Sequence, residues 1–514
     1  MNSRITRRLG KAFPDALISQ KRKMKPVIPF IGDTWWLGVG RVLLFTVLLF
    51  LCFFILFIRL FHLTIIRGHE YRALADGNRI RELVRHAPRG QLLDRTGKPV
   101  AVNEAQYRRL LPCEAGRTAN GACVSYLTQA EGEALEKTGL PVGSFLETDW
   151  KRRYVLGSAT AHILGTTGEI TAGELKDEYY QLRNYRTGDR IGRSGVEAIY
   201  EDRLRGRDGK ELVEVDASGR ILRVLGRDTE VTGIDIILSI DAGLSQVVAQ
   251  AFPEGKRGAI IVSKPATGEI LAMYSSPSYD PNLMSTGLSE DEYRKLADSS
   301  DRPMFNRAIG GVYPPGSTFK IVTAVAGLEE GAITGSTEIE DTGIISVGPF
   351  SFTNWYFTQY GRTEGMVNVI RALQRSNDIF FYRTGERTGI ERLAVWARRM
   401  GLGSLTGIEL PGEAAGLMPD PDWKSKHFTT DADLEARNNL WYAGDTYHIA
   451  IGQGYILTTP LQTAVWTDII AAGGRYCVPT IEKVHPGISS GPACQELPIK
   501  KETLSLVTDG MVKA

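Results

Sequence analysis

The chain has 514 residues, which is enough for about three domains of ordinary size. Its 61 lysine and arginine residues nearly balance its 59 aspartate and glutamate residues. This near-neutral charge gives no reason to expect a nucleic-acid partner, since such partners are bound through an excess of positive charge.

The most apolar stretch of the chain follows a basic lead. Residues 1–25 are rich in lysine and arginine and hold one acid, Asp15, whereas Val42–Ile58 carries no charge. Apolar residues continue beyond it, so residues 42–66 predict one membrane-spanning helix. A cleavable signal peptide is the alternative, but the long apolar core and the lack of a small-residue cleavage site after it argue against that. By the positive-inside rule residues 1–41 stay in the cytoplasm and the chain after about Ile66 is exported.

The cysteines fit an exported chain. Cys52 lies in the predicted span, and the other four form two locally spaced pairs, Cys113 with Cys123 and Cys477 with Cys494. Neither spacing suits a zinc knuckle. We expect two disulfides, because the oxidising side of the membrane favours them, with free cysteines as the alternative.

Residues 67–231 are polar and mixed, and they contain no catalytic constellation. Strand-like runs such as Gln91–Leu93 lie between turn signals, and GRSGVEAIYEDRLRGRDG (192–209) predicts an amphipathic helix between glycine-rich ends. Lys137-Thr138-Gly139 follows a helical pattern and is interpreted as a helix end with a capping glycine. We therefore expect a spacer or docking module.

A different composition begins at about residue 232. Residues 233–252 pass from a strand-like run into a helix pattern, and residues 257–276 hold two apolar runs around Pro265-Ala266-Thr267-Gly268, which is a strong hairpin signal. An antiparallel sheet followed by a buried helix predicts an α+β domain over residues 232–514.

That buried helix follows YPPGSTFK, which places Ser317 three residues before Lys320. The residues up to Leu328 are apolar on nearly every face, and a Pro-Pro-Gly breaker precedes Ser317, which predicts that Ser317 lies in the first turn. Residues three apart share a helix face, so the lysine amine should lie within reach of the serine hydroxyl. Burial would lower the pKa of Lys320, as a base requires. On these residues alone, a serine N-cap with a lysine that extends to the surface is the alternative.

Two more polar motifs follow in apolar surroundings. Ser376-Asn377-Asp378 precedes IFFY, and taken alone its pattern is typical of a helix N-cap. Gly452-Gln453-Gly454 precedes a strand-like run and a helix, but it is too short for a phosphate loop and lacks that loop's Lys-Ser/Thr.

Taken together, these blocks resemble the class B penicillin-binding proteins, and within them the elongation-type branch, the penicillin-binding protein 2 group. Ordered blocks over almost the whole chain carry the resemblance: RGQLLDRTGKPVAVN, GRSGVEAIYEDRLRGRDG, RGAIIVSKPATGEILAMYSSPSYDPN, NRAIGGVYPPGSTFK, SNDIFFY and GDTYHIAIGQGYILTTPLQ. The resemblance implies an α+β chain with three parts. These are the transmembrane helix at 42–66, an extended pedestal of the dimerisation type at 67–231, and a transpeptidase domain at 232–514 with the serine-acyltransferase fold of serine β-lactamases.

The resemblance also implies a role for each candidate site residue. Ser317 is the acylated nucleophile, Lys320 is the base that takes its proton, and Ser376 relays a proton to the leaving D-alanine. Asp378 stands where elongation-type relatives usually carry Asp and division-type relatives Asn. The implied reaction is peptidoglycan D,D-transpeptidation, in which a serine acyl-enzyme made from a D-Ala–D-Ala stem is resolved by an amine of a neighbouring stem.

The implied partners are stem peptides, β-lactams, the membrane and a polytopic glycan polymerase of the cell-elongation machinery. The implied location is the inner membrane, crossed once, with the catalytic domain outside the cytoplasm. No cofactor or metal is implied. Some elongation-type relatives bind zinc near the position of Asp422 and His427, but we interpret that segment as a surface loop.

The third motif of the family is not found where the resemblance places it. A Lys-Thr/Ser-Gly strand is expected a few dozen residues after VTDGMVKA, so we interpret the chain as C-terminally truncated. The alternatives are a division-type class B transpeptidase, a membrane-tethered β-lactamase or antibiotic sensor, and a non-catalytic scaffold that activates a glycan polymerase.

Overall fold

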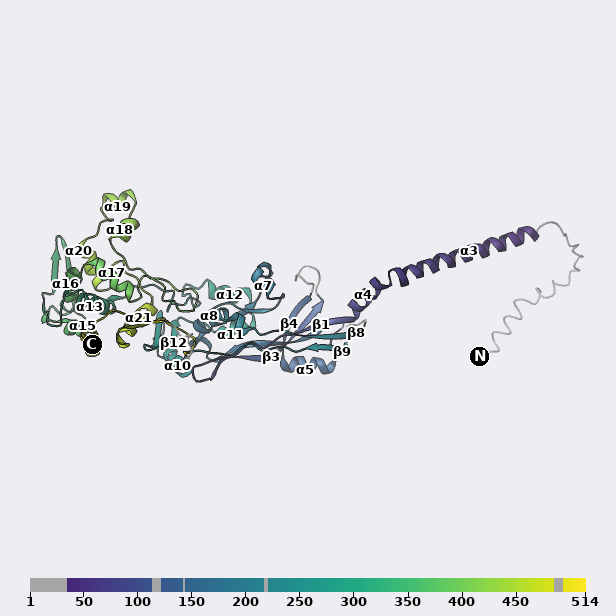
Figure 1. Cartoon of the computed structure of the whole chain (residues 1–514), viewed down its shortest axis with the longest axis horizontal. Coiled ribbons are helices and arrows are strands. Elements are labelled where there is room, and N and C mark those ends of the chain that lie inside the picture. The colour runs from purple at the N-terminus through teal and green to yellow at the C-terminus, as the bar shows by residue number, and fades with distance from the viewer. Residues whose placement is uncertain (1–34, 113–121, 142–143, 217–220, 485–492) are drawn as a thin grey trace, which may run out of the picture. The chain divides into compact units, whose positions relative to one another are not determined.

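The computed structural model describes residues 35–112, 122–141, 144–216, 221–484 and 493–514 (Figure 1). The chain divides into two compact units, residues 1–80 and 81–514, and each is described by itself.

The described part of the first unit is helical. Helix α3 (Trp35–Phe61) continues through a π-helical segment (His62–Ile66) and is followed by α4 (Gly68–Arg79). Within it Val39–Ile66 is long and apolar enough to cross a membrane, with a mean hydropathy of 2.9. This stretch coincides with the span that the sequence predicts at residues 42–66.

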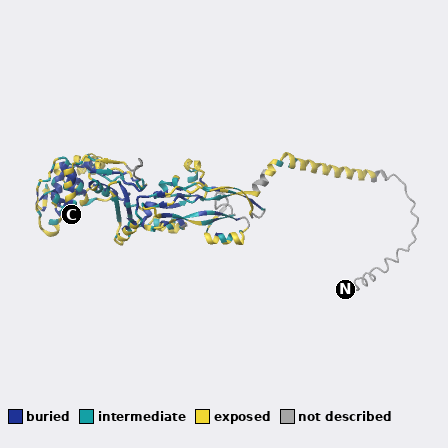
Figure 2. Cartoon of the chain, turned by 60° about the horizontal axis from the view of Figure 1, so that its bottom comes forward, coloured by how far each residue is buried: buried dark blue, intermediate teal, exposed yellow. Residues whose placement is uncertain are grey.

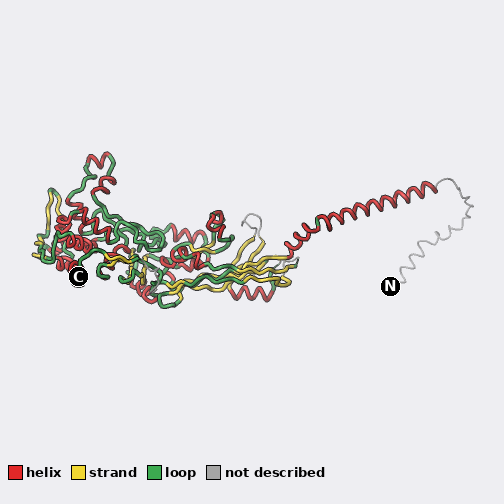
Figure 3. The backbone as a smooth tube through the Cα atoms, in the orientation of Figure 1, coloured by secondary structure: helices red, strands yellow, loops and turns green. Residues whose placement is uncertain are grey.

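The pedestal is built from long antiparallel strands. Its five-stranded sheet has the order β10-β2-β3-β4, and β5 pairs with β3; a second sheet has the order β1-β8-β9. The strands are β1 (Ile80–Arg85), β2 (Leu92–Leu93), β3 (Pro99–Pro112), β4 (Ala122–Thr128), β5 (Phe145–Tyr154), β8 (Gly209–Val215), β9 (Ile221–Asp228) and β10 (Ile236–Ile237). Figure 3 shows these strands running together along the pedestal. Ile236 pairs in parallel with Leu92, so β10 lies beside β2 although most of the pedestal sequence separates the two strands.

Short helices and one small hairpin cover these sheets. They are α5 (Gln129–Thr138), α6 (Ala161–Leu164), α7 (Glu178–Leu182), α8 (Gly195–Ile199), α9 (Glu201–Leu204), β6 (Thr167–Glu169) and β7 (Arg190–Gly192). Helix α5 ends at Thr138, and Gly139 follows with a φ of 93° while its N–H binds the carbonyl of Leu135. The interpretation of Lys137-Thr138-Gly139 as a helix end is confirmed.

The expectation of one amphipathic helix at residues 192–209 is wrong. The segment forms two short helices, α8 and α9, that break at Tyr200. Glu197 and Glu201 on these helices are buried. The guanidinium of Arg89 forms ion pairs with both acids, and that of Arg152 pairs with Glu197, which stabilises their buried charges. The alternation of charged and apolar residues in the sequence does not reveal that Glu197 and Glu201 are buried.

The C-terminal part of the chain contains the predicted hairpin. Strand β11 (Gly258–Lys264) pairs antiparallel with β12 (Glu269–Ser276). The helices are α10 (Ala242–Ala251), α11 (Pro281–Thr286), α12 (Glu290–Ala297), α13 (Lys320–Glu329), α14 (Trp355–Tyr360), α15 (Val369–Arg375), α16 (Asp378–Thr388), α17 (Ile390–Arg399), α18 (Pro421–His427), α19 (Asp431–Glu435), α20 (Ala443–Ala450), α21 (Pro460–Ala471) and α22 (Lys501–Lys513). Short strands complete it: β13 (Ile339–Asp341), β14 (Ile344–Val347), β15 (Phe350–Thr353), β16 (Gly365–Val367), β17 (Arg475–Cys477) and β18 (Cys494–Glu496).

Helix α13 lies in the main apolar core of this part of the chain. Its residues Val322–Leu328 are buried, as predicted, and they pack with apolar side chains of α15, α16, α17, α20, α21 and α22 (Figure 2). A second core joins the pedestal to the hairpin, because Leu92 and Ile236 share it with Ile270 and Met273.

One of the two expected disulfides is present in the structure. Cys477 and Cys494 are bonded and link β17 to β18. The pair Cys113 and Cys123 lies outside the residues whose side chains the structure describes.

Candidate active site

Ser317 lies in a tight turn that the chain on either side holds in place. The residue belongs to a single 3₁₀ turn, Gly316–Phe319, that leads directly into α13, so Lys320 is the first residue of the helix. Phe319 is fully buried and packs edge-on against Trp466. Ser317 itself is exposed, whereas Lys320 is buried. The turn therefore presents the serine to solvent and carries the lysine into the core.

The Gly452-Gln453-Gly454 motif supports this turn. The N–H of Gly316 donates to the carbonyl of Gly452 at 2.9 Å. Gly452 has a φ of +75°, and a Cβ at this position would lie 2.1 Å from the carbonyl oxygen of Gly316. Only a glycine permits this approach, because any other side chain would collide with the turn. The motif thus serves backbone packing.

Ser376-Asn377-Asp378 forms the junction between α15 and α16. Ser376 adopts a left-handed conformation, with φ 51°, where α15 ends. The side chain of Asn377 caps α16 by accepting from the N–H of Phe380 at 2.9 Å. The motif does contain an N-cap, but the cap is the asparagine. The hydroxyl of Ser376 and the carboxylate of Asp378 are therefore available for other contacts.

Those contacts connect the junction to Ser317 and Lys320. The Ser376 Oγ–H donates to Ser317 Oγ at 2.8 Å. The Lys320 amine donates to three acceptors: Ser376 O at 2.8 Å, Ser376 Oγ at 3.0 Å and Asp378 Oδ1 at 2.6 Å. Among the hydrogen bonds of the described residues, none joins Lys320 directly to Ser317. The predicted contact is therefore indirect, since the Ser376 hydroxyl lies between the lysine and Ser317.

Burial sets the electrostatics of Lys320. The side chain is almost wholly buried, and its desolvation lowers its pKa below that of a free lysine. The Asp378 carboxylate opposes this by attraction and by its hydrogen bond. The ammonium also lies 5.7 Å from the Phe381 ring. The amine is therefore easier to deprotonate than an exposed lysine, yet its ion pair with Asp378 holds it in place.

Further residues, which the sequence analysis missed, fix Asp378 and Asn377 by hydrogen bonds. The backbone N–H of Trp355 donates to Asp378 Oδ2 at 2.9 Å, and the N–H of Asp378 donates to Asn354 Oδ1 at 3.2 Å. Asn354 and Asn377 both donate to Asp341 Oδ2, at 2.9 and 3.1 Å.

Glu364 completes this buried network. Its Oε2 accepts from the Asn377 amide at 3.1 Å, while its Oε1 is paired with Arg375 at 2.6 Å. Asp341, Asn354 and Glu364 lie in a short strand and in loops without a recognisable motif, so the sequence pattern gave no signal for them.

Asp422 and His427 take no part in the network around Ser317, and they lie on helix α18 rather than in the expected surface loop. Asp422 is exposed and paired with Lys426, and the His427 ring stacks on Trp423 with their centroids 4.7 Å apart. Among the described residues neither belongs to a cluster of three or more potential metal ligands.

Comparison with known proteins decides the family. The penicillin-binding protein transpeptidase domain matches residues 258–514, and the penicillin-binding protein dimerisation domain matches residues 122–238. The peptidoglycan D,D-transpeptidase MrdA of Acinetobacter baumannii is 35% identical over 483 residues, which are 87% of this chain and 70% of that protein. The chain belongs to the penicillin-binding protein transpeptidases. The expectation of an elongation-type penicillin-binding protein 2 is confirmed, and with it the activity of a peptidoglycan D,D-transpeptidase.

Solved penicillin-binding proteins share the fold. The Helicobacter pylori penicillin-binding protein 2, solved in complex with MreC, is 28% identical and superposes with a TM-score of 0.70, covering 84% of each chain. A chain from a structure of a peptidoglycan synthase complex that coordinates polymerization and crosslinking is also 28% identical, with a TM-score of 0.68. It covers 93% of this chain and 85% of that one.

Proposed function

We propose that Ser317 is the nucleophile of this transpeptidase and that Lys320 is its base, acting through the Ser376 hydroxyl. The supporting observation is the continuous set of hydrogen bonds from Lys320 through Ser376 to Ser317. It runs from a buried amine to an exposed hydroxyl, as proton removal from an accessible nucleophile requires.

The three acceptors around Lys320 suit both protonation states. A lysine ammonium has three N–H donors, which match Ser376 O, Ser376 Oγ and Asp378 Oδ1. A neutral amine keeps two donors for Ser376 O and Asp378, and its lone pair can then accept from the Ser376 hydroxyl. Gain and loss of a proton therefore need only a rotation of hydroxyl hydrogens.

The proposed reaction has two steps. Ser317 Oγ attacks the carbonyl of the penultimate D-alanine of a stem peptide, and its proton passes through Ser376 to Lys320. The bond to the terminal D-alanine then breaks, and its nitrogen receives that proton by the same path. In the second step an amine of a neighbouring stem attacks the ester, its proton returns to Ser317, and a cross-link is released.

Asp378 is proposed as the group that fixes and tunes the base. It holds the amine at 2.6 Å and is itself fixed by the N–H of Trp355. This arrangement also supports the elongation-type assignment over the division-type alternative, in which an asparagine is expected.

The partners and location are proposed from the relatives and from the first unit. We propose that the apolar helix Val39–Ile66 crosses the inner membrane once, with residues 1–41 in the cytoplasm. The domains are proposed to divide as the sequence analysis placed them, with the pedestal at 67–231 and the transpeptidase domain at 232–514. A polytopic glycan polymerase is the proposed partner, by analogy with the synthase complex. A scaffold role can accompany the enzymatic one.

Covalent labelling tests the assignment of the nucleophile. The assay uses a protein that continues through a Lys-Thr/Ser-Gly motif after Ala514, referred to below as the extended protein, with fluorescent penicillin and peptide mapping of the labelled residue. We expect the label on Ser317 and its loss in Ser317→Ala. The matched control is Thr318→Ala, which removes a hydroxyl that donates to Pro315 O and is not among the hydrogen-bond partners of Lys320. Label that persists in Ser317→Ala, or that maps to another residue, would refute the assignment.

A further inference from the structure

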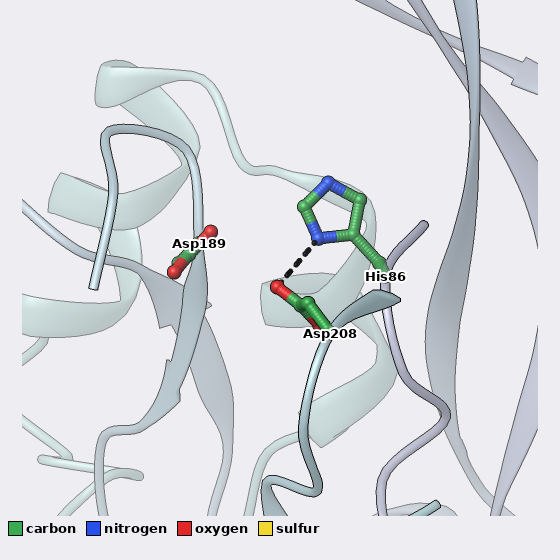
Figure 4. A group of neighbouring side chains, drawn as sticks. All are labelled: His86, Asp189 and Asp208. Atoms are coloured by element: carbon green, nitrogen blue, oxygen red, sulfur yellow. Dashed lines mark ion pairs between the residues drawn. The ribbon is translucent and has the colours of Figure 1, made fainter. Parts of the chain in front are cut away.

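A cluster of three potential metal ligands lies in the pedestal, apart from the site around Ser317. His86 follows β1, Asp189 precedes β7, and Asp208 precedes β8 (Figure 4). One ligand atom from each side chain lies within 4.8 Å of the other two. The three side chains come from separate segments of the chain and line one side of the same small cavity.

Each carboxylate has one oxygen held by the backbone and one that is available. Asp208 Oδ1 accepts from the N–H of Ala87 at 2.8 Å, while its Oδ2 lies 3.5 Å from His86 Nδ1. Asp189 Oδ2 accepts from the N–H of Arg186 at 2.9 Å and from Arg205 at 3.2 Å. Asp189 Oδ1 is buried without a hydrogen-bond partner, and Asp189 as a whole is only 6% exposed. A buried carboxylate oxygen without a partner is costly unless a ligand satisfies it.

The histidine is also arranged as a metal ligand would be. With Nδ1 toward Asp208, its other ring nitrogen, Nε2, lies 3.7 Å from Glu147 Oε2. Glu147 is in turn fixed by Arg108 at 2.9 Å. A carboxylate on this side is the usual partner that orients a metal-binding histidine, and here the 3.7 Å separation leaves His86 Nε2 without a hydrogen bond.

From these contacts we propose that His86 Nδ1, Asp189 Oδ1 and Asp208 Oδ2 bind a zinc ion. One nitrogen and two carboxylate oxygens form a donor set that zinc accepts, with ligand bonds of about 2.0–2.2 Å and a fourth position for water. Ligand atoms of such a tetrahedral site lie roughly 3.3 Å apart. The 3.5 Å between His86 Nδ1 and Asp208 Oδ2 already fits, whereas Asp189 must move inward, because the ligand atoms of the cluster lie up to 4.8 Å apart.

Two features of the cluster oppose zinc binding. Burial lowers the pKa of His86, but the neighbouring Asp208 and Glu147 carboxylates outweigh it and raise the pKa to about 9, so zinc must displace a proton. Arg205 also draws on Asp189, although it uses the other oxygen.

The proposed ion would act as a structural tie. It would join the segment after β1 to those before β7 and β8, at the point where the three-stranded sheet of the pedestal begins. It has no part in the acyl transfer at Ser317, so the activity of the enzyme is not its readout.

Zinc binding to the whole chain tests the proposal. Protein purified in detergent without a histidine tag is stripped with chelator, dialysed against zinc and measured by elemental analysis and titration calorimetry. We expect one tightly held zinc per chain, and anomalous scattering at the zinc absorption edge that places it between the three side chains. Asp189→Asn should weaken binding by at least the roughly 10- to 100-fold that loss of an outer ligand partner costs.

Matched variants keep the outcome decisive. Asp189→Asn keeps an oxygen for the N–H of Arg186 but loses the charge that pairs with Arg205, so the melting temperature of the metal-free variant is measured beside that of wild type. His86→Gln is the second ligand variant. His427→Gln removes an exposed histidine that stacks on Trp423, and it should leave binding unchanged. Absence of bound zinc in the wild type, or equal binding by the wild type and both ligand variants, would overturn the proposal.

Discussion

Lys320 has no donor to spare, and this limits what can replace it. Its amine occupies a buried position with three acceptors at 2.6–3.0 Å. If Lys320 supplied only positive charge, another cationic side chain could replace it, whereas a base must be able to release its proton. The two roles can be separated by substitution.

We expect Lys320→Arg to fail almost as completely as Lys320→Ala. Arginine keeps the positive charge but does not deprotonate in proteins, and its larger fork does not fit the space of an ammonium. The measurement is the second-order rate of penicillin acylation in the extended protein. An arginine variant within a few-fold of wild type would show that Lys320 supplies charge alone.

Asp378→Asn should shift the pH dependence of acylation. Asp378 opposes the lowering of the Lys320 pKa by burial, so its neutral replacement lets that pKa fall further. The reactive form of Lys320 is the neutral amine, which is populated above its pKa. The acid limb of the acylation profile should therefore move to lower pH.

A profile of acylation rate against pH for wild type and variant checks this. Asp422→Asn, at an exposed ion pair with Lys426, is the control and should leave the limb in place. Movement of the limb to higher pH in Asp378→Asn would contradict the role given to Asp378.

At the scale of elements, the helix behind Ser317 could be predicted because its pattern is local. A breaker cluster followed by a continuous apolar run specifies the start of a buried helix, but α13 begins at Lys320 and Ser317 lies in the 3₁₀ turn before it rather than in its first turn. The position of the Ser376 hydroxyl between Lys320 and Ser317 could not be predicted, because it depends on the left-handed turn that separates α15 from α16. Asp341 and Asn354 stabilise that turn from segments whose sequence has no periodicity.

Gly452→Ala should distort the turn that carries Ser317. The added Cβ would lie 2.1 Å from the carbonyl oxygen of Gly316, and its φ of +75° adds a strain of about 1–3 kcal/mol. We expect a lower melting temperature and a loss of penicillin labelling. The control is Gly331→Ala, which has a φ of +69° but open space around the new Cβ. If both variants lose stability and labelling equally, the close approach to Gly316 has no effect of its own.

At the scale of the whole molecule, the pedestal is held by a buried charge network. Arg89 and Arg152 bind Glu197, with the Arg152 Nε at 2.6 Å, and Glu201 shares Arg89. The sequence analysis predicted the short strand near Gln91–Leu93 but not the long strands β3, β4, β5, β8 and β9, and it placed these acids on one amphipathic helix. Burial of a charged residue depends on partners far along the chain, and these are invisible to a local pattern.

Glu197→Gln should destabilise the fold by about 3–5 kcal/mol, because it leaves two buried guanidinium groups short of their counter-ion. The ion pairs lower the pKa of Glu197 against the effect of burial, so its contribution is present at neutral pH and is lost as the pH falls through the folded pKa. Urea unfolding at pH 7 and at acid pH measures both effects. Asp202→Asn breaks an exposed pair with Arg183 on the adjoining helix and should cost about 0–1 kcal/mol. Equal losses in the two variants would show that the buried network contributes no more than a surface pair.

Because β2 pairs with β10, this part of the pedestal sheet can form only after both strands have been synthesised. A ribosome releases Leu92 long before Ile236, so β2 must wait for its partner while the strands between them are made. The wait is longer for Leu238 and Glu269, whose bridge partners are Glu482 and Thr480. Until those residues emerge, the growing chain exposes unpaired strand edges, which favour aggregation. The pairing of Leu238 and Glu269 is therefore completed only when the chain beyond Thr480 has been made.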